Sequence, residues 1–263
     1  MLRRRSKERR SPGRRARRNA PRLRDYVHQR GGASHRPAAW RPPLLGFTLV
    51  ELLVVLVIIG VLAAVIIPVA AGARMVARRA SCMSNMRQLG AAMLLYAGDN
   101  KDNLPVTTHN ADDYTQTWIY LLRPYVGNMD AIRVCPAESS ERKKKIIDNM
   151  GTSYVLNDRV VERKAYRRLT GIPNPSRTLL MCILSESKNP TTTWDHIHGG
   201  AWRDWSGVID DIDPNRHRLG AQTANKLNGS SNYLYADGHV QNIKASDLKR
   251  LVDSGINPAE VPE

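Results

Sequence analysis

Residues 46–73 read GFTLVELLVVLVIIGVLAAVIIPVAAGA, and this stretch decides how the chain is built. From Leu52 to Ala73 it holds 22 residues without a charged side chain, most of them Val, Leu, Ile and Ala. At 1.5 Å per residue a helix of this length measures about 33 Å, enough to cross the ~30 Å hydrocarbon core of a membrane. A long helix of a soluble protein normally has a polar face, which this run lacks. The stretch therefore predicts a transmembrane helix over residues 47–73.

The charge of the chain lies almost entirely before this run. The 263 residues carry a formal net charge of +16, of which fifteen basic and two acidic side chains place +13 within residues 1–46. That segment is rich in Arg, Pro and Gly and poor in large aliphatic residues, so we expect a disordered basic leader. Basic flanks stay on the cytoplasmic side, which predicts a cytoplasmic N-terminus and an extracytoplasmic head. The remaining 217 residues carry only +3, so no nucleic-acid partner is expected.

The apolar run continues into an amphipathic segment, residues 74–98. Apolar side chains recur there at steps of four, three, four and three, which is the spacing of one helix face. They are Cys82, Met86, Leu89, Met93 and Tyr96. We therefore predict one long helix from Phe47 to about Ala97, whose second half packs against a globular head, residues 99–263. A head of this size can enclose a single core.

Local patterns within the head predict a mixture of strands and short helices. The range 114–126 is typical of a short helix, and the apolar run 178–184 is typical of a buried strand. Asp237-Gly238 lies between two apolar stretches, which favours a tight hairpin turn. Residues 245–252 indicate a last short helix. The expected fold class is α+β, with a long N-terminal helix on a small, mostly antiparallel β head.

The junction before the apolar run resembles the type IV prepilin and type II secretion pseudopilin family. Members have a basic leader that ends in Gly, then Phe, then a hydrophobic helix with Glu as its fifth residue. Gly46, Phe47 and Glu51 match that pattern, although a leader of 46 residues is long for the family. The resemblance implies that prepilin peptidase cleaves between Gly46 and Phe47 and methylates the new amine of Phe47. It also implies that Glu51 meets the N-terminal amine of a neighbouring subunit, since a carboxylate at the edge of a hydrocarbon run is costly without a partner.

The head resembles a large prepilin-like group whose C-terminus carries a His, nine residues and then Asp-Gly. The matching stretches are 82–90, Cys135-Pro136 and 232–240. The chain departs from the pattern because Leu227, which nine residues separate from Asp237, stands where the histidine is expected, and the nearest upstream histidine is His217. An insertion between His217 and Asn232 would explain the longer spacing.

The resemblance implies a pilin-like structural subunit rather than an enzyme. Such a subunit sits in the inner membrane with a single pass and assembles with other pilin or pseudopilin subunits into a type II secretion pseudopilus or a type IV pilus-like filament. No cofactor is expected. The alternative is a membrane-anchored extracytoplasmic protein with a binding or metal-binding role, one that uses the prepilin sorting route without polymerising.

Three sets of side chains in the head are candidates for chemistry. A disulfide between Cys82 and Cys135 would tie the head to the long helix, and three free thiols are the alternative. Asp210, Asp211 and Asp213 offer oxygen ligands for a structural calcium, which some pseudopilins bind in a C-terminal loop. His196-x-His198 with the adjacent Asp195 is a set of metal ligands without a fixed motif spacing. The sequence holds no phosphate-binding loop and no H-E-x-x-H helix.

Overall fold

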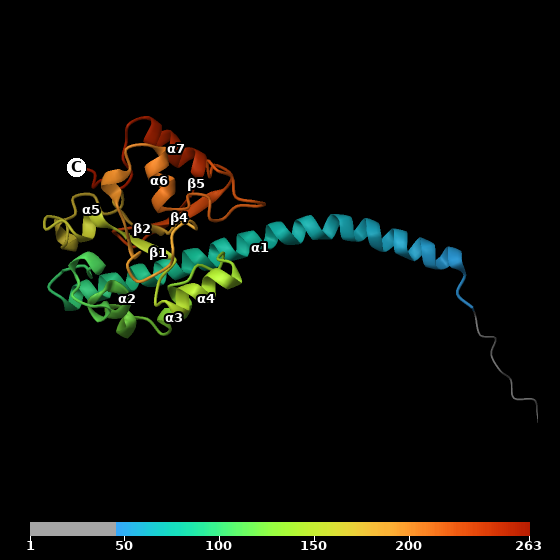
Figure 1. Cartoon of the computed structure of the whole chain (residues 1–263), viewed down its shortest axis with the longest axis horizontal. Coiled ribbons are helices and arrows are strands. Elements are labelled where there is room, and N and C mark those ends of the chain that lie inside the picture. The colour runs from blue at the N-terminus through green and yellow to red at the C-terminus, as the bar shows by residue number, and fades with distance from the viewer. Residues whose placement is uncertain (1–45) are drawn as a thin grey trace, which may run out of the picture. The chain divides into compact units, whose positions relative to one another are not determined.

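The computed structural model describes residues 46–263, so the predicted leader lies outside the described residues except for Gly46. Helix α1 spans Leu49–Asp99, 51 residues, and continues through Pro68 (Figure 1). The prediction of one long helix is confirmed, with its ends about two residues from the expected positions.

The two halves of α1 differ in what surrounds them. Large apolar side chains of the first half, such as Leu56 at 61% and Ile67 at 68%, are exposed. An 18-residue window of this half is not buried at all, and its length and composition suit a membrane span. The second half buries one face against the head, as its amphipathic pattern predicts. The buried residues are Cys82, Met86, Leu89, Gly90, Ala92, Met93 and Ala97.

The head is built around a five-stranded sheet in the order β3-β1-β2-β4-β5. The strands are β1 Tyr154–Asn157, β2 Leu179–Ile183, β3 His196–Ile197, β4 Ser230–Tyr235 and β5 Val240–Lys244. β1 pairs with β3 in parallel, whereas the other three pairings are antiparallel. The predicted α+β class and the buried strand over 178–184 are both confirmed.

Side chains alternate across this sheet and divide the core into two layers. Tyr154 and Leu156 of β1 join the cluster that contains the buried face of α1. Val155, between them, joins the cluster built with α6 (Trp205–Asp211) and α7 (Ala245–Asp253). Figure 1 shows α1 on one side of the sheet and these two helices on the other. The predicted last helix is thus confirmed as α7.

The remaining helices are short. They are α2 Trp118–Leu121, α3 Met129–Ile132, α4 Ser140–Asp148, α5 Asp158–Val161 and the 3-10 turns η1 Thr108–Asn110, η2 Tyr114–Gln116, η3 Arg123–Tyr125, η4 Leu169–Gly171 and η5 Gly199–Ala201. The single helix predicted over 114–126 is therefore corrected to three separate turns, η2, α2 and η3. Thr117 adopts an extended backbone and its hydroxyl donates to the carbonyl of Tyr114, which ends the first turn. Pro124 lacks an amide proton and lies within the third.

The β4–β5 hairpin confirms the turn predicted at Asp237-Gly238. Leu234 pairs with Val240, and Gly238 has a φ of +90°, which a residue with a side chain adopts only with strain. Asp237 Oδ1 accepts a hydrogen bond from the backbone amide of His239 at 3.0 Å. Asp237 and Gly238 therefore form a structural turn.

Candidate functional site

The predicted cleavage site lies immediately before α1. Gly46, Phe47 and Thr48 have no regular secondary structure, and the Phe47 side chain is 77% exposed. Glu51 is the acidic residue of the first turn of α1. The Gly46–Phe47 bond therefore lies outside regular secondary structure, and its cleavage stays a prediction.

The three aspartates predicted to bind calcium contact different side chains of the protein. The partners are Lys188 Nζ for Asp210 at 2.8 Å, Trp202 Nε1 for Asp211 at 2.9 Å, and Lys226 Nζ and an Arg216 terminal nitrogen for Asp213 at 2.5 and 2.7 Å. Among residues 46–263, the groups of side chains close enough to share an ion do not include these carboxylates. The structure therefore does not bring the three carboxylates together as ligands of one ion.

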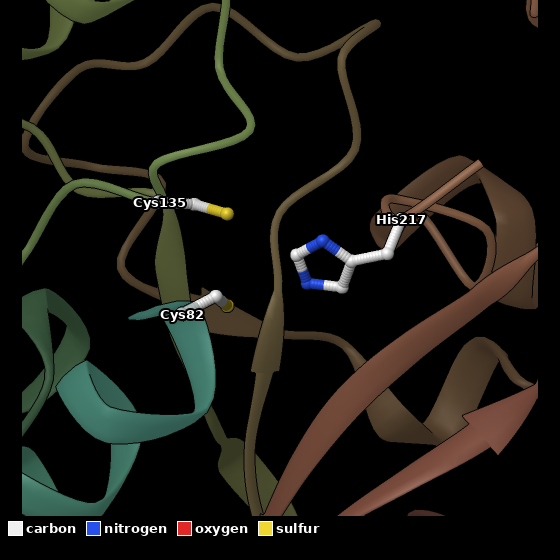
Figure 2. A group of neighbouring side chains, drawn as sticks. All are labelled: Cys82, Cys135 and His217. Atoms are coloured by element: carbon white, nitrogen blue, oxygen red, sulfur yellow. The ribbon is translucent and has the colours of Figure 1, made fainter. Parts of the chain in front are cut away.

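Cys82, Cys135 and His217 converge in the interior of the head (Figure 2). One atom of each, a Sγ or a ring nitrogen, lies within 4.8 Å of the others, and all three residues are buried. Cys82 comes from α1, Cys135 follows α3, and His217 precedes β4. The structure holds the two cysteines as free thiols rather than as the predicted disulfide, although it places them side by side.

Burial and neighbouring groups shift the pKa values of the Cys82 and Cys135 thiols in opposite directions. Burial raises the pKa of the Cys135 thiol, and the hydrogen bond with Cys82 raises it further. Burial also acts to raise the pKa of Cys82, but hydrogen bonds with Cys135 and His217 outweigh it and bring that pKa well below its usual range. The shared proton environment thus favours the thiolate on Cys82 rather than on Cys135.

His217 lies beside the start of β4. Its backbone amide donates to the carbonyl of Ser230 at 2.9 Å, so the two residues form a bridge at the base of the loop 218–229. That this loop is an insertion relative to the family stays a prediction. Asn232 Nδ2 lies 3.3 Å from His217 Nε2.

A buried arginine beside this group was not predicted from the sequence. Arg216 is fully buried and forms ion pairs with Glu138 at 3.0 Å, Asp213 at 2.7 Å and Glu186 at 2.7 Å. Its guanidinium also donates to the carbonyl of Leu184 at 2.7 Å. Burial acts to lower the pKa of Arg216, but the carboxylates outweigh it and raise that pKa above its usual range. Glu138 is 78 residues away, so no local pattern indicates the pairing.

A second group consists of three histidines at one end of the sheet. His109 lies in η1, His196 in β3, and His198 directly after β3. One nitrogen of each lies within 4.8 Å of the others. The His196-x-His198 pair was a sequence candidate, whereas His109 was missed because nothing in its neighbourhood marks it as a ligand.

Asp195 holds the two parts of this group together. Its carboxylate accepts hydrogen bonds from the backbone amide of Thr108 at 3.1 Å and from the Thr108 hydroxyl at 2.9 Å. Its Oδ1 also lies 2.7 Å from His196 Nδ1. One buried carboxylate therefore fixes both the turn that carries His109 and the ring of His196.

Two segments of the chain match known families. Residues 45–67 match the family described as "Prokaryotic N-terminal methylation motif". Residues 71–133 match the family described as "Protein of unknown function (DUF1559)". No curated protein and no solved structure matches the chain.

Proposed function

We propose that this chain, whose two family matches support a type IV prepilin-like protein, is a structural subunit of a type II secretion pseudopilus or a type IV pilus-like filament. Prepilin peptidase cuts it between Gly46 and Phe47 and methylates the Phe47 amine. The processed subunit, anchored in the inner membrane with its head outside the cytoplasm, then assembles with other pilin or pseudopilin subunits through α1.

The observation that carries the proposal is the division of α1 into two halves. The first half exposes a continuous apolar surface, which water tolerates poorly and which either lipid or neighbouring helices can cover. The second half is built into the core of the head, so one continuous helix joins the exposed apolar half to the head. A subunit that assembles through its helix carries its head on such a connection.

Glu51 supports assembly because of its place in the first turn of α1. A carboxylate at the edge of a hydrocarbon layer is costly unless a cation or a donor meets it. Cleavage creates a new amine at Phe47, and in a stack of subunits this amine can reach the carboxylate of a neighbour. The pairing would set the axial stagger between subunits.

Processing is tested by mass spectrometry of the N-terminal peptide of the mature protein. We expect the chain to begin at Phe47 with one methyl group on its amine, and a Gly46→Val variant to keep residues 1–46. An N-terminus upstream of Phe47 on the mature wild-type protein would overturn the proposal.

Assembly is tested separately with Glu51→Gln, which keeps the size of the side chain and removes its charge. We expect membrane insertion and cleavage to persist while cross-linked oligomers in the membrane and sheared filaments are lost. Val50→Ala, which changes an exposed apolar neighbour, is the matched control and should assemble. Normal assembly of the Glu51→Gln protein would refute the proposed role of this carboxylate.

A further inference from the structure

The three histidine rings of the second group approach one another closely enough to share a ligand. The ring centroids of His109 and His196 are 4.0 Å apart, those of His196 and His198 are 5.1 Å apart, and those of His109 and His198 are 5.9 Å apart. Among the described residues, each of the three rings has a nitrogen in contact with a carboxylate rather than with a lysine or an arginine. The rings thus offer several nitrogen atoms to one small volume.

Each ring turns the same nitrogen, Nδ1, toward a carboxylate. His196 Nδ1 lies 2.7 Å from Asp195, His109 Nδ1 lies 3.2 Å from Glu162, and His198 Nδ1 lies 3.7 Å from Asp211. A carboxylate accepts hydrogen bonds, so in neutral His196 and His109, whose Nδ1 atoms are within hydrogen-bond distance, the proton sits on Nδ1 and the lone pair on Nε2. Metal-binding histidines almost always have such a carboxylate or a carbonyl on their second nitrogen, because it orients the ring and makes the ligand more basic.

The nitrogen that faces away from the carboxylate in His196 lacks a partner. His196 is buried, and its Nε2 has no hydrogen-bond partner among the described residues. A buried ring nitrogen normally finds a partner, because leaving it unsatisfied costs about 1–3 kcal/mol. A ligand supplied from outside the chain would remove this cost.

We propose that His109, His196 and His198 bind a zinc ion through their Nε2 atoms, with the fourth coordination position open. Neutral imidazoles are good ligands for zinc, whereas calcium prefers oxygen, so this group suits a transition metal. The surrounding carboxylates supply negative charge that offsets the two positive charges of the ion. This site is independent of the proposed role in assembly.

The geometry leaves room for the small adjustment that binding requires. Tetrahedral zinc with nitrogen ligands at about 2.05 Å brings those nitrogens to about 3.3 Å from one another. In the structure one ring nitrogen of each histidine, Nδ1 or Nε2, lies within 4.8 Å of the others. The buried His196 ring is fixed by Asp195, while the His109 and His198 side chains, 53% and 47% exposed, have space to close on the ion. Their exposure also keeps one side open to solvent, where a water molecule or a small anion would complete the shell.

The test measures zinc binding by the full-length chain in detergent, by competition with a chromophoric chelator. Wild type is compared with His109→Ala and His198→Ala, which change half-exposed side chains and so spare the core. We expect each to weaken zinc binding by at least about 100-fold. His239→Ala is the matched control, because His239 is similarly exposed and also has its Nδ1 on an aspartate, Asp237, but lies on the hairpin turn. This variant should bind zinc as wild type does.

A further variant separates a ligand from a residue that orients one. Glu162→Gln keeps the contact with His109 but removes the charge, and we expect zinc affinity to fall by about 10–100-fold, less than for His109→Ala. Cobalt substitution then distinguishes this site from the Cys82, Cys135 and His217 group, because a thiolate ligand adds an intense charge-transfer band that a three-histidine site lacks.

The outcomes decide the proposal in either direction. Zinc affinity that depends on His109 and His198 together with a cobalt spectrum free of thiolate charge transfer supports it. Zinc binding that is unchanged in His109→Ala and His198→Ala, wild-type protein that takes up no zinc, or a thiolate band that disappears in Cys82→Ser would each overturn it. Failure of filament assembly in the Glu51 variant bears on the proposed function alone.

Discussion

Replacing Arg216 with Met tests whether its buried ion-pair network holds the head together. Met preserves most of the apolar bulk of the side chain but removes every charge-assisted hydrogen bond of the guanidinium. The loss leaves Glu138 and Asp213, both fully buried, with one cation fewer. Removing one partner of a buried pair costs about 3–5 kcal/mol, because the remaining charge is neither solvated nor neutralised.

The structure places the expected effect of this change near the lower end of that range. Glu138 keeps Arg142 at 3.2 Å and the Ser153 hydroxyl at 2.9 Å, and Asp213 keeps Lys226 at 2.5 Å. A loss of about 3 kcal/mol in the free energy of unfolding lowers the Tm of a domain of this size by roughly 6–12 °C.

Thermal unfolding of the full chain in detergent, followed by near-UV circular dichroism of the buried tryptophans, measures this shift. Arg218→Met is the matched control, because Arg218 lies two residues away and, among the described residues, forms an ion pair with Glu186 alone, which is 36% exposed. It should lower the Tm by no more than roughly 2–4 °C, since ion pairs that reach solvent contribute about 0–1 kcal/mol. An Arg216→Met protein that melts together with Arg218→Met would refute the reasoning.

Three other changes probe the rest of the head. Oxidation should join Cys82 to Cys135, whose sulfur atoms lie within 4.8 Å, and closing a loop of roughly 54 residues should add about 4 kcal/mol of stability. A Cys82 that is still alkylated after oxidation would contradict this. Leu89→Ala should cost about 2–5 kcal/mol because the side chain is fully buried, whereas Leu56→Ala on the exposed half of α1 should leave the Tm of the head unchanged. Gly238→Ala should destabilise the head by about 1–2 kcal/mol because its φ of +90° is left-handed, and an unchanged Tm would argue against strain at this turn.

Local patterns in the sequence were sufficient for the elements whose interactions are local. The apolar run and the stripe from Cys82 to Tyr96 predicted α1, because a helix repeats its contacts every three to four residues. Asp237-Gly238 predicted the β4–β5 hairpin, because its turn joins neighbouring strands. The helix expected over 114–126 was broken into turns, since Thr117 and Pro124 interrupt the hydrogen-bond ladder that its apolar spacing suggests.

By itself, therefore, the sequence determined the long apolar helix, the match to an N-terminal methylation motif at its start, and the α+β class. Only the tertiary structure decided which side chains share a site. His109 reaches His196 because Asp195 accepts hydrogen bonds from Thr108, 87 residues away, and His217 meets Cys82 because β4 packs on α1. Contacts between residues so distant in the chain depend on how α1, the sheet and the loops pack, and no periodicity in the sequence records them.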